Sequence, residues 1–125
     1  MIDLTMHPEN LKNTVELAKK RNILIPTFKQ MRDPDAHTPA KIKERLKGKG
    51  LWDVDPVNLF RITWKNQPQQ SGGLYGKVNY FEVPREITGI KTRIFAICGK
   101  WFPTGAHKVG ASFGCLVPRL VTGQF

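Results

Sequence analysis

Long apolar runs are missing from this chain of 125 residues. No stretch approaches the roughly 20 consecutive apolar residues that a membrane-spanning helix needs. The opening segment Met1–Pro8 is short and mixed, and lacks the charged start and apolar middle of a secretory signal. We therefore expect a cytoplasmic protein with no membrane association.

Cysteine is scarce, and no metal-binding spacing is visible. Cys98 lies in an apolar run and Cys115 lies in a stretch of small residues. The two are not spaced like the paired ligands of a zinc site. We expect two buried thiols and no metal centre.

Carboxylates are also scarce, and none follows Glu86. The chain has 20 Lys and Arg against 10 Asp and Glu, which gives a formal charge of +10. Such an excess is typical of proteins that bind polyanions, but here both halves of the chain share it. In the one dense run, Lys41–Lys49, the cations scatter around a helix instead of forming a stripe. The carboxylate-free end favours an anionic ligand or an acidic partner surface.

Apolar residues recur at helical spacing in three segments, each with start and stop signals. We expect helices from Pro8 to Arg21, from an N-cap at Thr38 to Gly48, and from about His107 to Pro118, which would kink or end the last one.

Strand signals lie between the second and third predicted helices. The segment Thr92–Cys98 contains several β-branched residues and is almost continuously apolar, which is typical of a strand buried on both faces. Lys77–Val83 is a second candidate strand, and Pro84–Gly89 reads as one helical turn with a glycine stop. We expect a loop over Thr27–His37 and an extended segment over Asn58–Trp64. The predicted fold class is therefore α/β, with short helices and a few strands.

Lys108, with His107 beside it, follows the predicted strand and begins the predicted last helix. The free N–H groups of a helix start carry partial positive charge, so a cation there is mildly unfavourable. The same field favours the neutral amine, and the free N–H groups form an anion site. This pattern predicts a nucleophilic amine close to a phosphate.

Two glycines lie inside the same predicted helix, Gly110 and Gly114. Each costs about 1 kcal/mol relative to alanine, so something should approach this backbone closely. Both tight packing against a sheet and a ligand over the helix start fit the pattern.

The run Thr104-Gly-Ala-His-Lys108, between an apolar strand and a helix of small residues, resembles the cofactor-lysine turn of one family. This family is the tryptophan synthase β-subunit-like superfamily of pyridoxal-phosphate enzymes, which have fold type II. The segments 58–64, 84–94, 99–108 and 114–125 are similar to its amino-terminal part. The resemblance implies one incomplete domain over 1–125, with a helical region at 1–50 and the start of the α/β cofactor domain at 51–125.

The resemblance implies that Lys108 is catalytic and forms an internal imine with the aldehyde of pyridoxal 5'-phosphate. Lys108, His107, Thr104 and Gly105 would bind the cofactor, with His107 near its phosphate. The implied activity is that of a lyase or synthase acting on an amino acid substrate.

The glycine-rich phosphate loop of this family lies far downstream of the lysine, and the sequence ends 17 residues after Lys108. We therefore expect an amino-terminal fragment or a split subunit that is inactive alone. Its strand and last helix should expose apolar faces, so that it self-associates or depends on the remainder of the enzyme.

Two alternatives stay open. Lys41–Lys49 together with Trp52, Trp64 and Trp101 would suit a basic module for single-stranded nucleic acid. The chain would also suit an interaction or regulatory remnant that folds on a partner.

Overall fold

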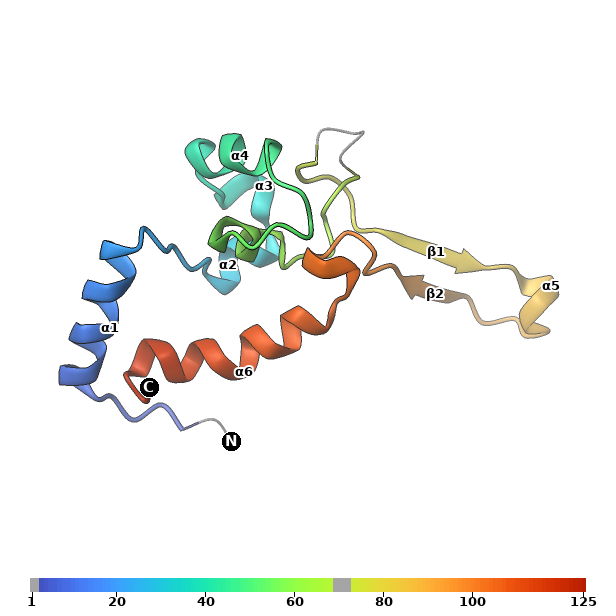
Figure 1. Ribbon diagram of the computed structural model, residues 1–125. Coiled ribbons are helices and arrows are strands. Elements are labelled where there is room, and N and C mark those ends of the chain that lie inside the picture. The colour runs from blue at the N-terminus through green and yellow to red at the C-terminus, as the bar shows by residue number, and fades with distance from the viewer. Residues whose placement is uncertain (1–2, 69–72) are drawn as a thin grey trace.

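The computed structural model describes residues 3–68 and 73–125. Helices form a body, and a two-stranded hairpin projects from it (Figure 1). This mixture of helices with a small sheet agrees with the predicted class of short helices and a few strands. In chain order the elements are α1 (Pro8–Lys20), α2 (Phe28–Arg32), α3 (Pro34–His37), α4 (Ala40–Lys47), η1 (Pro56–Arg61), β1 (Tyr80–Val83), α5 (Arg85–Thr88), β2 (Ile94–Ile97), η3 (Pro103–Gly105) and α6 (Lys108–Thr122).

Helix α1 confirms the first predicted helix and lies against α6. Pro8 occupies its first turn, where a missing N–H costs nothing, and Asn22 leaves the helix with a left-handed φ of 51°. The N–H of His7 donates to the carbonyl of Thr122 at 2.7 Å. The segments around His7 and Thr122 therefore lie side by side (Figure 1).

The prediction of a loop over Thr27–His37 is wrong, because this stretch forms α2 and α3. The Thr27 hydroxyl accepts from the Gln30 N–H, and the Gln30 side chain accepts from the Thr27 N–H, which is a capping box. Pro34 opens α3 at its first turn instead of breaking a helix.

Helix α4 and η1 build the first of two apolar clusters. Ile42 and Leu46 of α4 pack against Val57 and Phe60 of η1, and Leu46 is completely buried. Pro39, not Thr38, occupies the N-cap position of α4. The prediction of an extended segment from residue 58 to 64 is also wrong, because most of these residues belong to the helix η1.

Asp55 explains why η1 is helical. Its carboxylate accepts from the N–H of Val57 at 2.9 Å, and Pro56 follows it at the first helical position. This hydrogen bond, together with Lys49, lowers the pKa of Asp55. A cap and a proline at this spacing favour a helix start over a strand.

Removing this cap is expected to destabilise the fold. Asp55→Ala should lower the free energy of unfolding by about 1 kcal/mol at neutral pH, as measured by urea denaturation. Because the pKa of Asp55 is lower in the folded state, its contribution is present above the ordinary value of 3.8 and is lost as pH falls through the folded value. Asp55→Asn keeps an acceptor without the charge and should cost less. Equal losses for the two variants at neutral pH would contradict this.

The second apolar cluster joins the body to the start of α6. Ile62, Phe102 and Phe113 are buried there, and Trp64 meets Phe102 edge to face with ring centroids 4.9 Å apart. A Cβ added at Gly110 would lie 3.5 Å from Ile62 and 3.8 Å from Phe102. Both are ordinary van der Waals distances, so an alanine would fit at Gly110 and packing does not explain this helical glycine.

Strands β1 and β2 pair antiparallel, with Tyr80 opposite Ile97 and Val83 opposite Ile94. Helix α5 follows β1 and ends at Gly89, whose φ is 66°. Both strands and the intervening turn confirm the predicted elements. The burial predicted for β2 on both faces is wrong for this chain, because Phe95 is 45% exposed and Ile97 is 55% exposed. The expected exposed apolar face of the strand is confirmed.

Helix α6 continues past Pro118 to Thr122, so the proline does not end it. Phe113 is buried, but Leu116 is exposed. Cys115 is exposed and Cys98 is half-buried, which corrects the prediction of two buried thiols. Cys115 lies on a side of α6 that solvent reaches, so its place in a stretch of small residues did not indicate burial.

Candidate functional site

Lys108 is the first residue of α6, as predicted, and its side chain is exposed. The turn before it contains two consecutive left-handed residues, Thr104 with φ 62° and Gly105 with φ 68°. The Thr104 N–H donates to the carbonyl of Leu51 at 2.9 Å, and the Gly105 N–H donates to that of Phe102. These bonds hold the chain in the sharp bend that leads into α6.

His107 occupies the N-cap position of α6 and lies against aromatic and backbone groups. Its ring stacks on Trp64 with centroids 5.6 Å apart and an angle of 30°. A Cβ at Gly99 would approach the Cβ of His107 to 3.0 Å, so only glycine fits here comfortably. Among the described residues no side chain caps this helix. The Gly110 N–H donates to the His107 carbonyl at 2.9 Å, and the N–H groups that precede it at the helix start can serve a ligand.

Asn66 ties the lysine-bearing turn to the body, which the sequence analysis missed. The residue is 2% exposed, and its amide nitrogen donates to the carbonyls of Thr63 at 3.1 Å and Trp101 at 2.9 Å. A third bond reaches the carbonyl of Arg61. Asn66 and Trp101 are 35 residues apart, so no local pattern in the sequence reveals the contact.

Trp52 was also missed as part of this region. A Cβ at Gly105 would lie 3.8 Å from its ring. Trp52 is 75% exposed, so it lies beside the turn and remains open to solvent. Trp52 and Gly105 are far apart in the sequence, so no local pattern predicts this contact.

The site therefore consists of an exposed primary amine, an uncapped helix start and a bend fixed from two sides. The four residues named from the sequence, Thr104, Gly105, His107 and Lys108, stand together on one continuous bend. Within the described ranges, Lys108 forms no ion pair and no carboxylate lies within ion-pair distance of it. Such an arrangement can present an amine to a carbonyl compound and bind an anion beside it.

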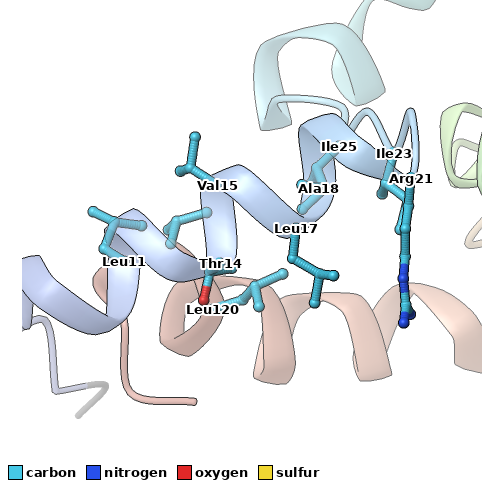
Figure 2. A pocket seen from close by; sticks show the side chains of 10 residues that line it. Leu11, Thr14, Val15, Leu17, Ala18, Arg21, Ile23, Ile25 and Leu120 are labelled. Atoms are coloured by element: carbon cyan, nitrogen blue, oxygen red, sulfur yellow. The ribbon is translucent and has the colours of Figure 1, made fainter.

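A separate apolar cavity of about 210 Å³ lies between α1 and α6 (Figure 2). Among the described lining residues only Arg21 is charged, and its side chain reaches from the end of α1 toward α6. Leu120 and Val121 contribute from the far end of α6, about 18 Å along the helix from Lys108. The cavity is therefore not part of the lysine turn. Its remaining lining residues are Leu11, Thr14, Val15, Leu17, Ala18, Ile23 and Ile25.

Residues 3–68 and 73–125 contain no group of three His, Cys, Asp or Glu side chains placed to hold a metal ion. Over the same ranges, every helix is too short or too polar to span a bilayer. Comparison with known proteins adds no family: neither a protein-family model, nor a curated protein, nor a solved structure matches this chain.

Proposed function

We propose that this chain is the lysine-bearing amino-terminal segment of a pyridoxal-phosphate-dependent enzyme of fold type II. The complete enzyme would be a lyase or synthase that acts on an amino acid. One observation carries the proposal: Lys108 is an exposed amine at the first position of an uncapped α6, directly after the bend at Thr104 and Gly105.

The chemistry of these groups fits the cofactor. The ε-amine of Lys108 would attach the cofactor through its aldehyde, and the free N–H groups at the start of α6 would bind phosphate. His107, held by its stacking on Trp64, would border the same anion. When bound, pyridoxal phosphate supplies an electron sink for the α-carbon of an amino acid.

The described residues provide one side of such a site. A cofactor pocket normally encloses its ligand, whereas Lys108, Thr104 and Gly105 are all exposed. We propose that another segment of the enzyme, or a second subunit, supplies the opposite wall. The uncovered apolar residues of β2 and α6 support this view, because they suit contact with further protein.

The nucleic-acid alternative gains less support from the positions of the tryptophans. Trp64 packs against Phe102 and His107, and Lys100 lies over the Trp101 ring at 4.8 Å. Of the three tryptophans, Trp52 is the one with a widely exposed ring. A stacking platform for single-stranded nucleic acid uses several free aromatic faces.

The test is covalent attachment of the cofactor, which does not depend on turnover. The chain is mixed with an equimolar amount of pyridoxal phosphate and reduced with borohydride, which converts the link between amine and aldehyde into a stable single bond. Intact mass should then show one added cofactor. Lys108→Ala should lose nearly all of it, because the amine is gone.

Lys100→Ala is the matched control, since Lys100 is also an exposed lysine close to the turn. This variant should keep the added mass. Equal labelling of the wild-type chain and Lys108→Ala would remove Lys108 from its proposed role.

A further inference from the structure

The β1–β2 hairpin exposes several large apolar side chains. It projects from the body, and in Figure 1 no other element covers either side of it. A two-stranded hairpin is marginally stable in water unless a third strand or a helix packs against it. Large apolar side chains are nevertheless exposed along both strands: Tyr80, Phe81, Ile94, Phe95 and Ile97.

Within residues 3–68 and 73–125, no strand pairs with the outer edge of β2. The Cys98 N–H donates to the Asn79 carbonyl at 2.8 Å, which makes residues 79 and 98 a hydrogen-bonded pair. Because such pairs alternate along an antiparallel ladder, the N–H and C=O groups of Phe95 and Ile97 point away from β1. These are the backbone groups that an added strand would use.

Charge distinguishes the β2 edge from the β1 edge. Lys91 precedes β2, Lys100 follows it, and β2 contains no carboxylate. Lys77 and Arg85 flank β1 in the same way, but β1 contains Glu82. Arg93 is already engaged, because its guanidinium donates twice to Glu82 at 2.8 Å. The β2 edge is thus an apolar strand with a cation beyond each end.

We propose that β2 binds an extended acidic segment of another protein, which adds a third strand to the hairpin. Its main chain would pair with Phe95 and Ile97, its apolar side chains would cover those of the hairpin, and its carboxylates would face Lys91 and Lys100. This inference does not require a cofactor at Lys108.

A second copy of the chain is a poorer occupant on electrostatic grounds. In a two-fold antiparallel pairing that uses the outward groups of β2, Phe95 of one copy lies opposite Ile97 of the other, and lysines of both copies come together at each end of the paired strands. Like charges brought close together are destabilising. Each copy also carries a formal charge of +10.

Two labelled ten-residue peptides test the proposal, one alternating valine with glutamate and one alternating valine with lysine. Fluorescence anisotropy at low salt measures binding, and hydrogen exchange measures protection of the backbone. The glutamate peptide should bind and slow exchange at Phe95 and Ile97, and its affinity should fall as salt is added. The lysine peptide should not bind.

The charge-reversed variant Lys91→Glu/Lys100→Glu should bind the lysine peptide and no longer bind the glutamate peptide. Its fold should stay intact, because both side chains are exposed. Lys12→Glu/Lys19→Glu on α1 is the matched control and should behave like the wild-type chain. Three results would each overturn the proposal: equal binding of both peptides, no binding of either, or dimerisation of the chain alone with protection at Phe95 and Ile97.

Discussion

Replacing Leu46 by alanine is expected to lower the free energy of unfolding by about 3 kcal/mol. Leu46 has no exposed surface and packs with Ile42, Val57 and Phe60. Its own carbonyl accepts a hydrogen bond of 2.6 Å from the buried guanidinium of Arg61. This bond ties α4 to the end of η1, so the two elements cannot easily close over the cavity that the missing side chain leaves.

Urea denaturation followed by circular dichroism measures the effect. Leu24→Ala is the control, because Leu24 is 50% exposed and its truncation should change stability by no more than about 0.5 kcal/mol. A loss at Leu46 no larger than that at Leu24 would mean that the α4–η1 cluster is not the core.

Gly123→Ala is expected to detach α1 from the end of α6 and to cost more than about 2 kcal/mol. Gly123 has a φ of 78°, where side chains are strained. An added Cβ would also clash with the carbonyl oxygen of His7 and lie 2.8 Å from the nitrogen of Leu11. These are backbone atoms, so they cannot move aside as a flexible side chain would.

Hydrogen exchange of the α1 amides checks this expectation, since exchange should become fast in the variant. Gly89→Ala is the matched control: its φ is 66°, but a Cβ there meets no atom within 4 Å. It carries the conformational cost alone, about 1 kcal/mol. Equal effects at the two glycines would show that the contact between the chain ends contributes nothing.

Local signals predicted several elements well. The proline at residue 8, the glycine at residue 89 and the apolar spacing of α4 each act within one or two turns of chain. The error over Thr27–His37 was avoidable, because Thr27 and Gln30 have the spacing of a capping box. Burial of β2 was not predictable in the same way, since an apolar strand has one composition whether or not a neighbour covers it.

The candidate site also combines a feature that the sequence predicts with contacts that it does not predict. The position of Lys108 at a helix start follows from the strand, turn and helix pattern around it. The stacking of His107 on Trp64 and the bond from Asn66 to Trp101 join residues that are distant in sequence. Such contacts depend on how the body packs, and a single sequence carries no local mark of them.

The most direct test of the proposed role is to identify which lysine carries the cofactor. After reaction with equimolar pyridoxal phosphate and reduction, proteolysis and mass spectrometry locate the added mass. The proposal predicts that the mass lies on Lys108, with little on Lys91 or Lys100. Label distributed over the exposed lysines without preference for Lys108 would contradict it.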